Sequence, residues 1–425
     1  MRASRSRVRF GELWQAGIGW GLVLAALATA SPARAGEEVG HSLTLSTEAT
    51  ARQHWFWLSD ILLHRAGLFD ADHGQLIGSI ASGSVGVGFA IYPHRSLDGS
   101  QIVIPESYFS RGVRGERTDV VTIYDAHTLS FVAEIPIPPK RAEYMPGVAS
   151  SALSDDGRTL AVFNVAPAQS LTLVNIIDRV FIAELETPGC SLVYPAGPER
   201  FFMLCGNGGA MVISRSGEEG AWAARRTAPF FDPEGDPISE KGARVGETWL
   251  FASFAGQVYP VDVSGRELRF GPTWSLFDDA ARAENWRIGG QQLLAAHAKS
   301  NRLYALVHQG GEDTHKDAGS EVWVWDLATQ ERIARIPTGN PLASFIRGQA
   351  HIGADSVSDR AASWALETLL PNPGSTGIMV TPDDEPRLIV VSLMPPAVIV
   401  HDARSGERIA EITEPGIALG LLARP

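Results

Sequence analysis

The feature that most constrains this chain is a repeat of short strands separated by turns. In its clearest copy, a polar turn at Ser154–Gly157 leads into strands at 160–165, 171–174 and 180–185. The strands alternate between apolar and polar residues or run continuously apolar, and turn residues separate them. This pattern predicts an all-β fold.

Six further copies follow the same plan. Three are equally clear, with strands at 102–105, 120–125 and 131–136, at 302–307, 322–326 and 332–337, and at 387–392, 398–402 and 408–412. Three are weaker, at 55–60 with 68–80, at 201–205 with 210–214, and at 249–254 with 257–262. Seven units about 55 residues apart predict a seven-bladed β-propeller, because four-stranded units that close into a ring leave few open edges. An open β-solenoid is the alternative, but its repeats are usually shorter than about 30 residues.

Aspartate followed by threonine marks the turn before the outermost strand of several copies. Asp125 with Thr128 and Asp326 with Thr329 have this spacing. We expect these side chains to accept hydrogen bonds from the backbone N–H groups of the turn.

Three segments fall outside the repeat. Residues 41–46 are a candidate strand that closes the ring by pairing into the last blade. Residues 271–290 are polar and helix-like around 278–286, and the segment 340–375 contains an amphipathic helix at 356–370. We expect the last two segments on a face of the ring, where propellers carry function.

The N-terminus has the pattern of an export signal. Four arginines precede an apolar run at 17–30, and Ala33-Arg34-Ala35 is a small-x-small cleavage site. The run is shorter than the roughly 20 residues that span a bilayer, which favours a cleaved signal peptide at 1–35 over a membrane anchor. We therefore expect residues 36–425 to form a single soluble domain in the periplasm.

The charge balance argues against a nucleic-acid partner. The formal net charge is −12, and loss of the leader, with its five arginines and one glutamate, brings it to about −16. Binding to phosphate backbones requires a basic face.

The chain has two cysteines, Cys190 and Cys205. An exported protein meets an oxidising compartment, so we expect them to form a disulfide that staples a hairpin. The closed loop of about 15 residues corresponds to roughly 3 kcal/mol in the chain-entropy model. Two buried free thiols are the alternative.

No established catalytic motif is present. The sequence lacks a G-x-S-x-G nucleophile elbow, a P-loop and a dinucleotide fingerprint. The glycine-rich stretches 83–88 and 206–209 do not open a helix after a strand, so we interpret them as turns. His308, Asp313 and His315 are candidate metal ligands, but with no further ligand nearby a solvated loop is the favoured interpretation.

Several longer strings carry a family resemblance. ESYFSRGVRGERTDVV lies at 106–121, IPPKR at 137–141, FMLCGNGG at 202–209, GPTWSLFDDAARAENWRIGG at 271–290 and EVWVWDLATQERIARIP at 321–337. Together and in this order they resemble the heavy subunit of the quinoprotein amine dehydrogenases. The PPKR, CGNGG and WSLFDD strings favour the aralkylamine (aromatic amine) enzyme over the methylamine enzyme.

The resemblance implies a periplasmic α2β2 heterotetramer in which this chain is a seven-bladed propeller with one disulfide, matching Cys190 and Cys205. The small subunit would carry the cofactor, tryptophan tryptophylquinone, and the catalytic aspartate, so that no catalytic residue is expected in this chain. Primary amines would be oxidised to aldehyde and ammonia. The electrons would pass to a blue copper protein of the azurin or amicyanin kind.

One substrate-channel residue is a candidate for transfer from the family. A Gly-Phe pair follows the outer strand of the first blade in the methylamine enzymes, and Gly88-Phe89 is the nearest match in this sequence. Phe89 is therefore a candidate channel residue, with an ordinary core aromatic as the alternative. The family pattern is several residues shorter in this region, and it lacks the 340–375 segment, which is expected as an insertion.

Two other functions remain open at this level. The chain could be an orphan periplasmic propeller that serves as a protein-binding scaffold. It could also be a self-sufficient propeller enzyme, such as a metal-dependent hydrolase, which would require several convergent ligands.

Overall fold

The computed structural model describes residues 43–81, 83, 92–142, 148–216, 220–353 and 356–424. The predicted signal peptide at 1–35, with its cleavage site near Ala35, lies outside these residues. Within the described residues, no helix combines the length and the apolar character needed to cross a bilayer.

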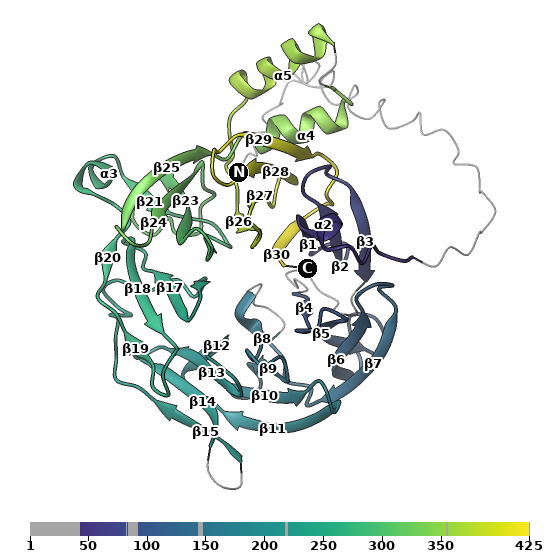
Figure 1. Cartoon of the computed structure of the whole chain (residues 1–425), viewed down its shortest axis with the longest axis vertical. Helices are drawn as coiled ribbons and strands as arrows, with labels where there is room; N and C mark the ends of the chain where they lie inside the picture. The colour runs from purple at the N-terminus through teal and green to yellow at the C-terminus, as the bar shows by residue number, and fades with distance from the viewer. Residues whose placement is uncertain are drawn as a thin grey trace, which may run out of the picture. The chain divides into compact units, whose positions relative to one another are not determined.

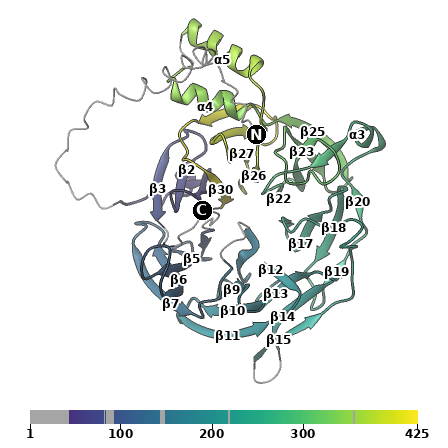
Figure 2. The same ribbon diagram turned by 180° about the vertical axis from the view of Figure 1, so that it is seen from behind.

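Seven antiparallel sheets form a ring around a central channel, and Figures 1 and 2 show the ring from its two sides. This confirms the predicted seven-bladed β-propeller. Within each blade the strands follow one another from the centre outward. Blade 1 is the exception, because its innermost strand comes from the C-terminal end of the chain.

The first four blades each have four strands, in the following order from the innermost outward. Blade 1 contains β30 (Leu419–Ala423), β1 (Trp55–Asp60), β2 (Arg65–Asp70) and β3 (Leu76–Ala81); blade 2 contains β4 (His94–Arg95), β5 (Gln101–Phe109), β6 (Arg117–Asp125) and β7 (Phe131–Ile137). Blade 3 contains β8 (Ser151–Leu153), β9 (Thr159–Asn164), β10 (Ser170–Asn175) and β11 (Val180–Glu186); blade 4 contains β12 (Cys190–Pro195), β13 (Arg200–Cys205), β14 (Ala210–Ser216) and β15 (Ala221–Arg226).

The last three blades follow the same order, with one additional strand in each of two. Blade 5 contains β16 (Ala243–Val245), β17 (Thr248–Ala252), β18 (Gln257–Asp262) and β19 (Arg269–Phe270), with β20 (Trp274–Ser275) also paired to β18. In blade 6, β21 (Trp286–Ile288) and β22 (Leu294–His297) both pair with β23 (Arg302–Gln309), which is followed by β24 (Glu321–Asp326) and β25 (Glu331–Pro337). Blade 7 contains β26 (Gly377–Val380), β27 (Arg387–Ser392), β28 (Ala397–Asp402) and β29 (Arg408–Ile412).

The position of a strand within its blade explains its composition. The second strand of blade 3, β9, is buried at every residue because both of its faces pack against neighbouring blades. The outermost strand, β11, is exposed or half-buried throughout. The second and third strands are therefore the most continuously apolar, and they are the strands that the repeat pattern predicted best.

The ring closes at its C-terminal end. Strand β30 pairs antiparallel with β1, with Leu58 opposite Leu422 and Trp57 opposite Ala423. The prediction of a closing strand at 41–46 was wrong, because the described part of that segment, from Leu43 on, forms no strand. Leu422 of β30 is fully buried, so the pairing of β30 with β1 removes apolar surface from water, whereas Leu43 remains 41% exposed.

The aspartate turns form as expected. Asp125 Oδ1 accepts hydrogen bonds from His127 N at 2.9 Å and Thr128 N at 2.8 Å. Asp326 Oδ1 accepts from the backbone nitrogens two and three residues further on, at 2.8 and 3.3 Å. These bonds fix the reversal between the third and fourth strands of the blades.

Helices are few. The short helix α2 (Ala49–Arg52) precedes β1, the 3₁₀ turn η1 (Val148–Ser150) precedes β8, and α3 (Asp279–Ala283) lies in the predicted helix-like segment. The 340–375 segment contains α4 (Pro341–Gln349) and α5 (Val357–Leu369), close to the predicted 356–370. Figure 1 places α4 and α5 beyond the outer edge of blade 7, which corrects the expectation that they lie on a ring face.

A buried arginine with two carboxylate partners explains the position of α4. Arg347 lies on α4 and is 7% exposed, and its guanidinium donates to Glu411 of β29 at 2.6 and 3.2 Å and to Glu367 of α5 at 3.1 Å. These bonds hold both helices against the outermost strand of blade 7, so α4 and α5 cover its rim.

Candidate functional site

The two faces of the ring differ in the connections that they carry. Because neighbouring strands are antiparallel, all turns between first and second strands, and between third and fourth strands, lie on one face, which we call the turn face. These turns are short, as at 96–100 and 154–158. The opposite face, which we call the loop face, carries the connections to the next blade and those between second and third strands, among them 227–242, 310–320 and 338–376. Binding residues concentrate on such longer loops.

The loop face also exposes apolar side chains on four consecutive blades. They lie in the connections of blades 7, 1, 2 and 3, where a free chain would leave them in water. We call this group the loop-face apolar set: Leu62 (45% exposed), Leu63 (41%), Val113 (70%), Val165 (44%), Met394 (72%) and Ile417 (52%). Exposed apolar residues that form a contiguous patch are typical of a surface that another chain covers.

The hairpin of β5 and β6 is held rigid by a buried carboxylate. Glu106 is fully buried, and its Oε2 accepts hydrogen bonds from the hydroxyls of Tyr108 and Tyr124 at 3.1 and 3.2 Å. Burial, followed by the charge of Glu106, raises the pKa of Tyr108 to about 12 and that of Tyr124 further, so both phenols stay protonated and donate. The other carboxylate oxygen accepts from Gly83 N at 3.3 Å.

A second network fixes the same hairpin close to its turn. Asp119 is 1% exposed and receives Nε and Nη2 of Arg117 at 2.7 Å each, and it also accepts from the backbone N of Arg141 at 2.9 Å. Most of these residues belong to the strings that carried the family resemblance. The structure therefore gives the strings at 106–121 and 137–141 a physical role, which is to support the exposed tip around Val113.

The candidate channel residue Phe89, together with Gly88, lies outside the described residues. Its described flanks show what the connection joins. Gly83 is bound to Glu106 under the hairpin, and Tyr92 lines the central channel. The two described flanks of this connection therefore lie at the hairpin and at the central channel.

The cysteines lie on the loop-face side of blade 4. Cys190 and Cys205 stand opposite each other on β12 and β13, with 3.9 Å between their Cα atoms, and form a disulfide. Gly206 N donates to Gly189 O at 2.9 Å directly beyond the bond. The glycine-rich string at 206–209 is a β-turn between β13 and β14, as predicted.

The candidate metal ligands do not form a cluster. His308 Nε2 lies 2.9 Å from Thr314 Oγ1, and the ring of His315 stacks on Phe254 with 3.5 Å between centroids. Burial lowers the pKa of both histidines. In the described chain, no three side chains of His, Cys, Asp or Glu gather as a metal site requires.

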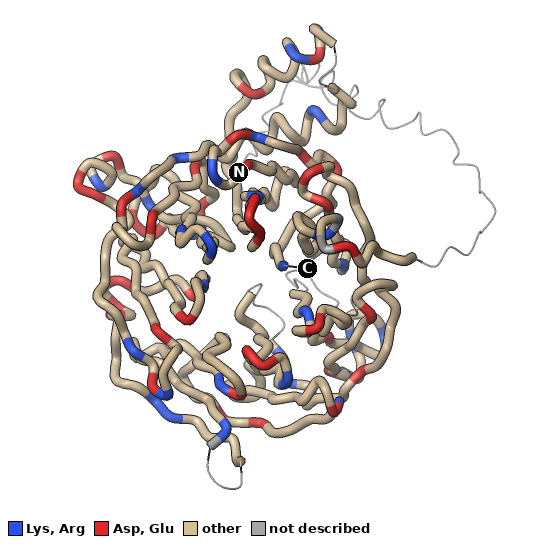
Figure 3. The backbone as a smooth tube through the Cα atoms, viewed as in Figure 1, with Lys and Arg blue, Asp and Glu red and all other residues tan. Residues whose placement is uncertain are grey.

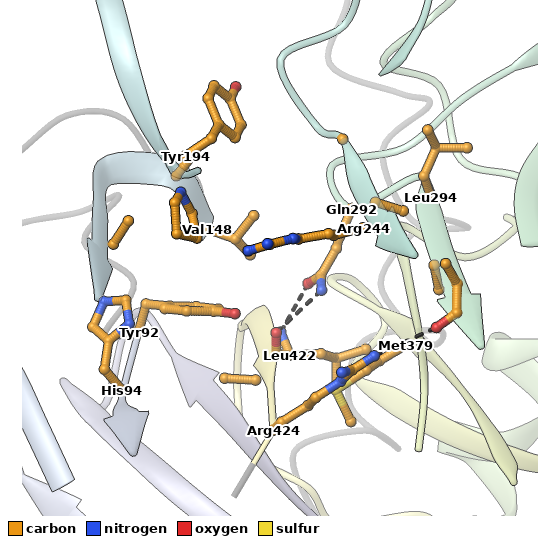
Figure 4. Close-up of a pocket in the computed structure, with 18 of the residues that line it drawn as sticks. Tyr92, His94, Val148, Tyr194, Arg244, Gln292, Leu294, Met379, Leu422 and Arg424 are labelled. Carbon is orange, nitrogen blue, oxygen red and sulfur yellow. Dashed lines mark hydrogen bonds between the residues drawn. The ribbon is translucent and has the colours of Figure 1, made fainter. Parts of the chain in front are cut away.

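A cavity of about 410 Å³ occupies the central channel. Every blade contributes its innermost strand or an adjacent residue, and Figure 4 shows Tyr92, Arg244, Gln292 and Arg424 directed toward the same space. The amide of Gln292 bridges to the backbone of Leu422, which donates from its N at 2.9 Å and accepts at its O at 3.1 Å. Sequence reasoning missed this site, because each lining residue comes from a different repeat and no local pattern marks it.

Solved structures of other proteins resemble this fold at low sequence identity. The periplasmic gluconolactonase PpgL of Pseudomonas aeruginosa matches with a TM-score of 0.52 and 15% identity, over 87% of this chain and 99% of that chain. The dihydro-heme d1 dehydrogenase NirN matches with a TM-score of 0.51 and 16% identity, over 88% and 75%. At such identities the likeness concerns the fold alone.

The comparison with sequence relatives is more informative than the comparison of folds. The methylamine dehydrogenase heavy chain of Paracoccus versutus is 26% identical over 352 residues, covering 82% of this chain and 73% of the relative. That of Methylorubrum extorquens is 25% identical over 357 residues, covering 82% and 76%. The family model described as methylamine dehydrogenase heavy chain matches residues 64–353, which includes blades 2 to 6 in full. The chain therefore belongs to the methylamine dehydrogenase heavy chain family.

Proposed function

We propose that this chain is the non-catalytic large subunit of a periplasmic quinoprotein amine dehydrogenase. In an α2β2 heterotetramer, a small subunit would carry tryptophan tryptophylquinone, which accepts the two electrons released when a primary amine and water become aldehyde and ammonia. The electrons would then pass to a blue copper protein. The PPKR, CGNGG and WSLFDD strings favour aromatic or aralkyl amines as substrates.

Family membership is the observation that carries the proposal. The relatives are named heavy chains, a name that implies a lighter partner. The loop-face apolar set supports the same division of labour, because it offers a partner an apolar surface on four neighbouring blades.

The small subunit would dock on the loop face over this set. Val113 is at the tip of the rigid β5–β6 hairpin, and Met394 lies in the connection between β27 and β28 of blade 7. Both are about seven-tenths exposed. Covering such side chains is favourable, whereas a carboxylate in their place would lose its hydration on binding without gaining a partner.

A paired substitution tests the docking surface. Val113→Asp should abolish or sharply reduce co-purification of the small subunit when both chains are expressed together. Leu97→Asp is the matched control, since Leu97 is also 70% exposed but lies in a turn-face connection. Equal recovery of the small subunit with Val113→Asp and with wild type would place the partner elsewhere.

An activity measurement tests the function itself. The purified complex should oxidise phenylethylamine or benzylamine in preference to methylamine with a dye acceptor, and the isolated chain should show neither activity nor quinone absorbance. Robust amine oxidation by the isolated chain would overturn the proposal. Binding to an unrelated periplasmic protein, with no quinone in the complex, would support the scaffold alternative.

Localisation has its own test. N-terminal sequencing of the chain from a periplasmic fraction should begin at or near Gly36. A chain that keeps Arg2 to Arg9 and stays with the membrane fraction would contradict cleavage at Ala35.

A further inference from the structure

We propose that the central channel is a binding site for a small dianion, such as a dicarboxylate, separate from the surface that binds the small subunit. The cationic side chains of the channel carry this inference. Arg95, Arg244 and Arg424 line the cavity from β4, β16 and the residue after β30. All three lie where an innermost strand approaches the turn face.

The charge of the lining is unbalanced. Among the described residues that line the cavity, no Asp, Glu or Lys accompanies the three arginines. The nearby carboxylate of Asp155 binds Arg244 through two hydrogen bonds of 2.6 and 2.8 Å and so balances one of the three charges, and Arg95 also has an interaction within the chain. The charge of the lining contrasts with that of the chain as a whole, whose formal net charge is −12.

Two carboxylates near the turn-face mouth already have partners. Figure 3 shows acidic and basic segments around the central opening. Asp383 lies 3.1 Å from His54 Nε2, and Asp384 binds Lys299 at 2.9 Å. Arg424, by contrast, makes only a long bond of 3.4 Å to a backbone oxygen, and no ion pair to any described residue. Its guanidinium is available to a ligand.

Neutral donors complete the site. Burial raises the pKa of the Tyr92 phenol, against the opposing effect of Arg424, so the hydroxyl stays protonated and can donate. His94 adds no competing charge, because burial lowers its pKa to about 4 and its Nε2 is 2.7 Å from Ser151 Oγ. Guanidinium groups bind carboxylates and phosphates through paired hydrogen bonds.

The walls limit the size of the ligand. Val148, Leu294 and Met379 line the cavity between the polar groups, as Figure 4 shows. A volume of about 410 Å³ is at the small end of the range for ligand pockets. A short dianion, with charges at its ends and a compact body, matches these dimensions better than a nucleotide.

The same charges exclude another class of molecule. Primary amines are cations at neutral pH, so the arginines repel them, and the central channel is not their route to a partner-bound cofactor. The dianion site therefore stands independently of the proposed amine oxidation. An experiment that disproves dianion binding in the channel leaves the proposed amine oxidation untouched, and the reverse also holds.

Isothermal titration calorimetry on the full-length chain, at low ionic strength, tests the site with succinate, inorganic phosphate and propylammonium. Wild type should bind succinate with a Kd of about 1 mM or tighter, and propylammonium should give no heat of binding. Arg424→Gln should weaken succinate binding about tenfold or more, because one charge-assisted pair is lost. Lys299→Gln is the matched control, since it removes a turn-face cation that does not line the cavity.

Comparing succinate with phosphate shows whether the site recognises dicarboxylates or small dianions in general. Binding of succinate alone identifies a dicarboxylate site, and binding of both with the same dependence on Arg424 identifies a site for small dianions in general. No binding of either dianion by wild type, or equal binding by Arg424→Gln with an unchanged circular dichroism spectrum, would overturn the inference. Amine oxidation by the complex should be the same in both variants.

Discussion

Asp60 joins the two ends of the described chain, and its replacement tests how the ring is closed. The side chain is 3% exposed at the end of β1. Its Oδ1 accepts from the backbone nitrogens of Leu62 and Leu63, both at 3.0 Å. Its Oδ2 accepts from Ile417 N at 2.7 Å, directly before β30. One carboxylate thus caps its own turn and fastens the closing strand.

Asp60→Asn separates these two tasks. Asparagine keeps one acceptor oxygen and replaces the other by an NH₂ donor. In either orientation of the amide, the donor faces a backbone N–H, so at least one bond is replaced by a repulsive contact. Loss of one hydrogen bond to a charged acceptor corresponds to about 1.5–3 kcal/mol of unfolding free energy. We expect Asp60→Asn to be destabilised by that amount.

Asp125→Asn is the control. Asp125 Oδ1 makes the same bonds to residues two and three further on, but this turn lies within blade 2 and does not join the chain ends. Its amide can keep the oxygen in the turn, so the expected change is below about 0.5 kcal/mol. Urea unfolding, followed by circular dichroism and tryptophan fluorescence, measures both variants. Equal destabilisation by the two substitutions would refute the assignment of a ring-closing role to Asp60.

The disulfide, the channel histidine and the rim arginine each have a measurable consequence for stability. Reduction of Cys190–Cys205, or its replacement by two alanines, should destabilise the chain by roughly 3 kcal/mol in urea, and a thiol titration of the native protein should find no free cysteine. Burial lowers the folded-state pKa of His94 to about 4, below its unfolded value of about 6.5. The stability that the neutral ring contributes is therefore complete above the unfolded pKa and is lost as the pH falls toward 4. His94→Gln should reduce the fall in the urea midpoint between about pH 7 and pH 4.5. Arg347→Met leaves Glu411 with only Arg408 as a cationic partner, and should cost about 2–4 kcal/mol of local stability, seen as faster proteolysis within 340–375.

The strands that the sequence predicted are those with a strong local signal. Strands such as β9 and β10 are long and almost wholly buried, so their composition alone identifies them. The shortest innermost strands were missed, because β4 has two residues and β16 has three, too few for any periodicity to appear. Their pairing is imposed by the strands outside them.

Ring closure could not be predicted locally. Leu43, Thr44 and Leu45 alternate like a strand, but only Leu45 is buried, and its N donates to His127 O at 2.7 Å. The choice of β30 depends on which end of the chain reaches the open edge of β1, and this is decided by contacts across more than 350 residues, such as Ser59 with Leu421.

The residues of the candidate site also differ in how well the sequence predicted them. The strings around Glu106 and Cys205 were recognised because their residues are contiguous, and the structure shows what they hold together. The channel arginines were missed because Arg95, Arg244 and Arg424 come from separate repeats and meet only when the ring is complete. No pattern of spacing connects them.

Because β30 pairs with β1, the first blade cannot be completed until the C-terminal end of the chain has been made. Ser59 and its partner Leu421 are 362 residues apart, so at the usual rates of translation the edge of β1 waits about 20 to 70 s for its neighbour. During that interval Trp57 and Leu58 present unpaired backbone groups and apolar side chains, the features that recruit foreign strands. A chain that has not yet formed β30 therefore exposes an open edge of β1 to which another strand can pair.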